Sequence, residues 1–224
     1  MSFDQPMPPF NASDPSASFL STSCLDFLMI ELVPMTYRVA NELDASEPPV
    51  PSLDINGNGA AGAGDVGSVA ATAIATGTAG SARRLDEDEE RDAVFFRLEG
   101  LGYRVGLGLV ERFSRDRPRF NDTLDAIKFI CKDLWMLVFK KQVDNLKTNH
   151  RGVYVLTDNA FRPLSRMSTD PGGRAVLRAQ PFLWFPCGVV RGALAAMGIA
   201  ATVQAETSEL PGAVFQIKTT PLKQ

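Results

Sequence analysis

The spacing of apolar residues along the chain predicts four helices. The first lies within residues 19–43, where an i, i+3, i+4, i+7 set on one face consists of Leu25, Leu28, Met29 and Leu32. Pro34 should kink or end this helix. Three further segments repeat apolar residues at the same period, and they cover residues 94–113, 124–138 and 186–197.

The remaining ordered segments read as β-strands. Residues 143–150 and 153–157 predict two strands joined at Arg151 and Gly152, and residues 161–164 predict a short third strand. A closing hairpin is predicted over residues 199–206 and 213–219. Because the order is helices, strands, a helix and strands, without regular βαβ alternation, we predict an α+β fold with an antiparallel sheet.

Composition divides the chain into one domain, a tail and an insert. Residues 1–18 are rich in Pro, Ser and Asn and are predicted to be a disordered tail. Residues 45–92 are dominated by Gly, Ala, Ser and Pro and end in the acidic run 86–90, so they cannot bury enough apolar surface to offset their ordering entropy. We therefore predict a single domain built from residues 19–44 and 93–224, interrupted by a disordered insert at 45–92.

Charge and residue counts argue against several classes of protein. The 224 residues carry a net charge of −3, which offers no basic field for nucleic acid or anionic lipid. One histidine and three cysteines without CxxC spacing argue against a zinc site or a disulfide framework. The first ten residues lack the basic residue of a secretory signal. The apolar stretch 182–203 contains Arg191, a proline and glycines, so we interpret it as a buried helix followed by a strand.

Motifs that could carry chemistry have plainer explanations. The calcium-loop pattern that starts at Asp54 lies in low-complexity sequence without flanking amphipathic helices. His150 stands at a hairpin bend, and Cys131 and Cys187 lie on apolar helix faces without a neighbour that would activate them. Since no nucleophile, base and oxyanion donors come together, we predict no catalytic residue, no cofactor and no metal ligand.

Glycines mark one side of the predicted helix at 94–113. Gly102 and Gly106 lie beside Leu109 and Val110, and each interior glycine costs about 0.5–1 kcal/mol relative to alanine. This side should therefore accept another backbone at short distance. Periodicity alone leaves open whether that backbone belongs to the same chain or to another.

Several long motifs carry a family resemblance. Residues 97–112 (RLEGLGYRVGLGLVER) resemble the second helix of the small subunits of the transport protein particle, TRAPP. Two stretches resemble its 33-kilodalton branch, called component 6 in animals, and they are residues 129–135 (FICKDLW) and 139–159 (FKKQVDNLKTNHRGVYVLTDN). Residues 187–194 (CGVVRGAL) resemble the fourth-helix signature of the family.

The resemblance implies a fold, a role and partners. It implies a two-layer α+β fold, with four main helices packed on a twisted antiparallel sheet. It implies a non-catalytic scaffold subunit of an assembly that tethers vesicles and exchanges nucleotide on a Rab GTPase in endoplasmic reticulum to Golgi traffic. The partners would be other TRAPP subunits, chiefly the central small subunit as a heterodimer, and indirectly an early-Golgi Rab. Membrane contact would come only through the complex, which would place this cytoplasmic chain at Golgi membranes.

The resemblance also implies where the partner binds. A dimer formed through the first two helices gives the candidate interface Leu25, Leu28, Met29, Leu32, Gly102, Gly106, Leu109 and Val110, and it predicts that Gly106→Leu separates the partners while the fold survives. No cysteine precedes the third helix, where the central paralogue carries an acylatable one, so lipid attachment there is not expected. The alternative function is a binding module that holds a hydrophobic small molecule or acyl chain between helices and sheet.

Overall fold

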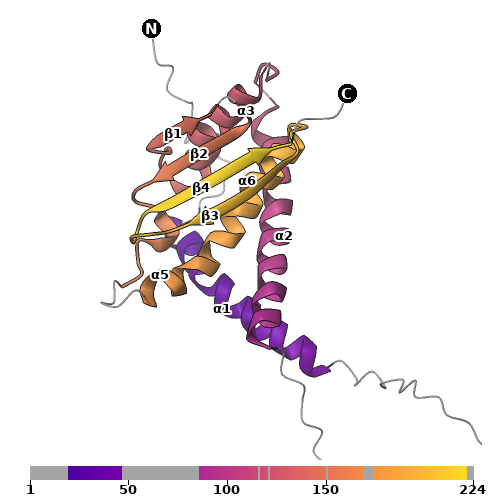
Figure 1. The fold of residues 1–224 in the computed structure, drawn as a ribbon, viewed down its shortest axis with the longest axis vertical. Coiled ribbons are helices and arrows are strands. Elements are labelled where there is room, and N and C mark those ends of the chain that lie inside the picture. Colours follow the sequence, from indigo (N-terminus) through magenta and orange to yellow (C-terminus); the bar gives the residue numbers. More distant parts are fainter. Residues whose placement is uncertain are drawn as a thin grey trace, which may run out of the picture.

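The computed structural model describes residues 20–46, 86–115, 117–120, 122–149, 151–168 and 174–220. The helices are α1 (Thr22–Ser46), α2 (Glu87–Phe113), α3 (Thr123–Phe129), α4 (Trp135–Phe139), α5 (Arg174–Ala179) and α6 (Trp184–Ala196). The strands are β1 (Asn145–Thr148), β2 (Val153–Asp158), β3 (Ala201–Glu206) and β4 (Ala213–Thr219). The predicted α+β class, with helices packed on an antiparallel sheet, is confirmed (Figure 1).

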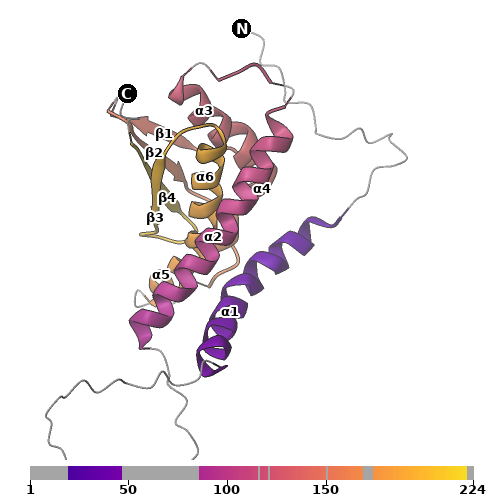
Figure 2. The ribbon, with the colours of Figure 1, turned by 90° about the vertical axis from the view of Figure 1, so that its right-hand side faces the viewer.

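The four strands form one sheet in the order β1-β2-β4-β3, and every neighbouring pair is antiparallel. Burial alternates along the central strands, as expected when only one face of a sheet is covered. In β2 the buried side chains are Tyr154, Leu156 and Asp158, and in β4 they are Ala213, Phe215 and Ile217. Helix α6 and the α3–α4 segment lie against this face (Figure 2).

Aromatic side chains fill the space between the sheet and the third predicted helix. The indole of Trp135 and the rings of Phe139, Phe161 and Phe215 pack with centroids 4.7–6.0 Å apart, in tilted and edge-on arrangements. All four side chains are buried. They join α4 to β4 and to the turn after β2, so this cluster is the centre of the main core.

Glycines on α2 meet glycines on α6. A Cβ atom on Gly102 or Gly106 would collide with the backbone of Phe185 or Val189, and a Cβ on Gly188 or Gly192 would collide with the backbone of Glu99 or Tyr103. The two helices therefore pack backbone to backbone, and Arg191 ties them further through its ion pair with Glu99. The prediction that Gly102 and Gly106 face a partner is wrong, because α6 of the same chain already fills that space. Val110 was also predicted to contact the partner, but its side chain is already buried in the main core of this chain, so it does not belong to the interface.

Helix α1 lies on the outside of the helical layer (Figure 2). Pro34 was predicted to kink or end this helix, and the structure shows no end there, because the helix continues through Pro34 to Ser46. Val33 and Ala40, one on each side of this proline in the sequence, pack with Val94 and Leu98 of α2 and with Trp184 at the start of α6, in a second, smaller core. Packing on both sides of the proline explains how the helix tolerates its missing N–H donor.

The boundaries of the predicted insert are wrong at both ends. Helix α1 reaches Ser46, and the acidic run forms the first turns of α2 rather than a linker end. Asp86 is the N-cap, and with Glu89 it forms a capping box, while the carboxylates of the first turn complement the helix dipole. Residues 47–85 and the tail 1–19, and with them the calcium-loop pattern, lie outside the described residues, as does His150.

Three smaller departures have local causes. Residues 162–164 form a 3-10 turn instead of a strand, because Pro163 has no N–H to donate to a ladder. The third predicted helix contains a π-helical segment, Ile130–Leu134, between α3 and α4. Helix α5 and a 3-10 turn at Gln180–Leu183 precede α6 and were not predicted.

Candidate subunit interface

The outer face of α1 is apolar and exposed. Its members are Leu28, Met35, Val39 and Leu43, whose side chains are 57%, 40%, 37% and 48% exposed. Their spacing of seven, four and four residues keeps them on one side of the helix, while Val33 and Ala40 point into the body. We call these four residues the outer face of α1. A row of large apolar side chains on one helix is the kind of surface that a partner covers.

The predicted interface residues differ in how far the structure exposes them. Leu28 belongs to the outer face of α1, whereas Leu32 is buried against the body. Leu25 and Met29 are half-buried and line a groove, and Leu109 is half-buried against the main core. Met35, Val39 and Leu43 were not among the predicted interface residues, and the signal for them was the apolar period of α1, which continues beyond Pro34.

The groove beside α1 combines an apolar lining with an ion-pair cluster. Its apolar walls come from α1, α4 and the turn after β2, and they include Leu25, Met29, Ile30, Val138, Phe139 and Pro163. Asp26 accepts two hydrogen bonds from Arg162, at 2.8 and 3.1 Å, and one from Arg166 at 3.1 Å. The hydrogen bond from Arg162 lowers the pKa of the Asp26 carboxyl, with a smaller contribution from Arg166. We call these three residues the Asp26 clasp.

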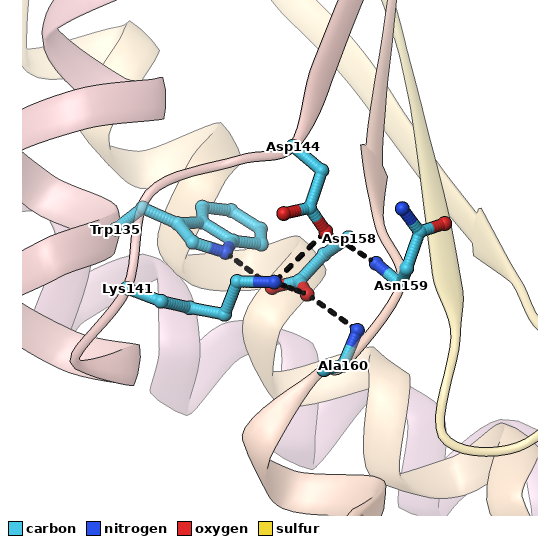
Figure 3. A network of polar contacts seen from close by, with 6 residues as sticks. All are labelled: Trp135, Lys141, Asp144, Asp158, Asn159 and Ala160. Carbon is cyan, nitrogen blue, oxygen red and sulfur yellow. Dashed lines mark hydrogen bonds and ion pairs between the residues drawn. The ribbon is translucent and has the colours of Figure 1, made fainter.

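A second polar cluster joins α4 to the sheet, and Figure 3 shows its six residues. The carboxylate of Asp158 is fully buried and accepts hydrogen bonds from the Trp135 indole at 2.8 Å, from Lys141 at 2.6 Å and from the backbone of Ala160 at 3.0 Å. Lys141 also pairs with Asp144, which in turn accepts from the backbone N–H of Asn159. Both carboxylates accept hydrogen bonds from other members of the cluster, so these contacts join the end of α4 to β2 and the turn after it.

Electrostatics in this cluster follow from those contacts. Burial disfavours the charge of Lys141, but its hydrogen bonds to Asp144 and Asp158 outweigh that effect and raise its pKa. The hydrogen bond from Lys141, followed by the one from the Asn159 backbone, lowers the pKa of Asp144. Both groups are therefore held in their charged forms at neutral pH.

The two buried cysteines are unreactive, and the described residues offer no metal site and no membrane-spanning helix. Burial raises the pKa of the Cys131 and Cys187 thiols to about 12, so neither is a thiolate near neutral pH. Within the described ranges, no three His, Cys, Asp or Glu side chains gather closely enough to hold a metal ion. Among the described helices, none combines the length and apolar character that a membrane crossing requires.

Comparison with known proteins identifies the family. The model of the family described as "Transport protein particle (TRAPP) component" matches residues 25–220, from the first turn of α1 to the end of β4. The chain belongs to the TRAPP component family. The resemblance noted in the sequence is thereby confirmed.

Several relatives of this TRAPP component are subunits of the component 6 type. Subunit 6b of the zebrafish trafficking protein particle complex is 52% identical over 130 residues, which cover 58% of this chain and 82% of the relative. Human subunit 6B is 53% identical over 121 residues (54% and 75%), and human subunit 6A is 48% identical over 120 residues (54% and 74%). A solved structure of subunit 3 from Naegleria fowleri, described as covalently bound to palmitic acid, is 17% identical, covers 59% of this chain and 84% of its own, and has a TM-score of 0.49.

Proposed function

We propose that this TRAPP component is a non-catalytic scaffold subunit that pairs, through the outer face of α1, with the central small subunit of a TRAPP assembly. The exposed apolar row on α1 supports this, because a helix face of that kind is costly to leave in water and suits a helical partner. The names of the relatives, subunits of a trafficking protein particle complex, support membership in such an assembly. The assembly would tether vesicles and exchange nucleotide on an early-Golgi Rab, which would bring the chain to Golgi membranes as a peripheral component.

A pair of charged substitutions on the outer face tests this proposal. Leu28→Asp with Met35→Asp should weaken binding to the co-expressed small subunit by well over tenfold, since each buried apolar side chain contributes roughly 1.5–3 kcal/mol. Leu177→Asp is the matched control, because Leu177 is 72% exposed on α5 and is not part of the outer face of α1. The measurement is the Kd by titration of the purified chains. Wild-type affinity in the double variant would contradict the proposed interface.

A second experiment tests the non-catalytic part of the proposal. The purified chain alone should leave the rate of nucleotide release from an early-Golgi Rab unchanged, because its described polar clusters are satisfied internally. The rate is followed by the fluorescence of a labelled nucleotide. Acceleration at micromolar concentrations of the chain, with no other subunit present, would contradict the scaffold role.

A further inference from the structure

The two halves of α1 are held to the body by different means. From residue 32 onward, which we call the C-terminal half, the side chains of Leu32, Val33 and Ala40 are buried in the second core. In the N-terminal half, no described side chain between Ser23 and Glu31 is buried. Hydrophobic packing therefore anchors one half strongly, and it leaves the other half with shallow contacts beside the groove.

The Asp26 clasp is the polar attachment of the N-terminal half. Arg162 meets the carboxylate through both its Nε and an Nη atom, which is the paired geometry that fixes direction as well as distance. The arginine stands on a turn whose neighbours Phe161 and Leu164 are fully buried. The guanidinium is thus presented from a rigid part of the core, and the carboxylate of Asp26 is only 11% exposed.

The helix hydrogen bond that Pro34 removes lies at the junction of the two attachments. A proline cannot donate to the carbonyl four residues earlier, which here belongs to Ile30, so the helix loses one hydrogen bond at this point. Two residues further on, the hydroxyl of Thr36 donates to the carbonyl of Leu32 at 2.7 Å, a bond of the kind that bends helices. The N-terminal half of α1 therefore has a point about which its direction can change.

We propose that the Asp26 clasp is a positioning device, which sets the direction of the N-terminal half of α1 so that Leu28 lies in line with Met35, Val39 and Leu43 for the partner. This inference rests on the proposed function of the outer face. Asp26 lies seven residues before Val33 and so shares its inward side of the helix, whereas Leu28 faces outward. The carboxylate accordingly acts on the partner only through the placement of α1.

Substitutions at Asp26 test the proposal. Asp26→Asn keeps the shape and removes the charge, and it should weaken binding of the small TRAPP subunit by roughly 3- to 30-fold, the range for residues that couple to a site without touching the ligand. Asp26→Glu keeps the charge and should recover most of the affinity. The matched control is Asp125→Asn, whose partner Lys128 lies on the same helix, α3, away from α1.

Hydrogen exchange supplies a readout that affinity alone does not. In the free chain, Asp26→Asn should speed amide exchange in residues 23–33 and leave residues 36–43 and the melting temperature of the domain near wild type. If the wild-type chain does not bind the small subunit while this local exchange change is seen, the proposed function fails and the clasp stands. If Asp26→Asn binds with wild-type affinity, or unfolds the whole domain, the positioning role is overturned.

Pro34→Ala tests the hinge in the same assay. Restoring the N–H donor to Ile30 should stiffen α1, so Asp26→Asn should cost less affinity in the Pro34→Ala background than in the wild-type chain. Equal losses in the two backgrounds would show that the clasp does not act through the direction of α1.

Discussion

At the residue scale, Asp158 shows what a linear pattern cannot reveal. In the sequence, Asp158 follows the predicted strand 153–157 and Lys141 follows the predicted helix 124–138, and neither pattern pairs the two residues. In the folded chain they form a buried pair, with the Trp135 indole as a third member (Figure 3). The partners of Asp158 lie 23 and 17 residues earlier in the sequence, and only the antiparallel return of β2 brings them together.

Removing the buried carboxylate should be costly. Asp158→Ala leaves the buried indole N–H of Trp135 without an acceptor and removes one of the two carboxylates that pair with Lys141, so the free energy of unfolding should fall by about 3 kcal/mol. Urea denaturation monitored by Trp fluorescence and by circular dichroism measures this loss. Asp125→Ala removes a carboxylate whose exposed pair with Lys128 should contribute at most about 0.5 kcal/mol. Equal losses in the two variants would contradict the structural role of Asp158.

Asp144 predicts a pH dependence of stability. Its pKa is lowered in the folded chain, so its contribution is complete above the unfolded pKa of about 3.9 and is lost as the pH falls through the lower folded value. Asp144→Asn should therefore flatten the fall of unfolding free energy on the acid side and reduce stability at neutral pH. Denaturation at a series of pH values between 3 and 7 measures both effects. An unchanged acid slope would show that Asp144 is not stabilised by Lys141.

At the scale of elements, the sequence predicts those features that carry a local pattern. Strands β3 and β4 are predicted because alternation and a Pro-Gly turn mark them, and α2 because its apolar period is long. The direction of the glycine face was not predictable from α2 alone. Gly188 and Gly192 repeat the four-residue spacing of Gly102 and Gly106, and this match was the available signal. The capping box of Asp86 and Glu89 could also be recognised in the sequence. It was not predicted because the acidic composition of residues 86–90 assigned them to the insert.

The packing of α2 on α6 predicts opposite effects for neighbouring glycines. Gly106→Leu should unfold the isolated chain, and Gly106→Ala should destabilise it by about 1–3 kcal/mol, since the added methyl meets the backbone of Val189. Gly108→Ala is the control, because no atom lies within 4 Å of its new Cβ, and it should stabilise α2 by up to about 1 kcal/mol. Thermal unfolding by circular dichroism measures both. A folded Gly106→Leu chain would mean that α2 and α6 can separate.

At the scale of the whole molecule, the chain is a core with one outlying helix. The sheet, α3–α4, α6 and α2 share a continuous apolar interior. Helix α1 lies at the edge (Figure 2), and several of its large apolar side chains are exposed. The N-terminal half of α1 has neither deep burial nor a polar outer surface, which a helix of an isolated protein would need. This arrangement suits a subunit in which a partner protein covers the exposed apolar face of α1.

The connection between α1 and α2 should tolerate shortening. Asn41 donates to Glu90 at 2.7 Å, so the end of α1 and the start of α2 lie close together and a short linker can join them. Replacing residues 50–82 with a short Gly/Ser linker shortens the connection to roughly a quarter of its length. Each halving of the length lowers the entropic cost of closing the loop by about 0.6 kcal/mol, so the melting temperature should stay equal or rise by a few degrees. Extending the replacement to residue 88 removes the Asp86 cap and should cost about 1 kcal/mol. Thermal unfolding compares the two variants with the full chain. A broad, low-temperature transition in the 50–82 variant would show that the replaced segment packs on the domain. A loss of stability seen only in the 50–88 variant would show that the ordered domain resumes at the Asp86 cap.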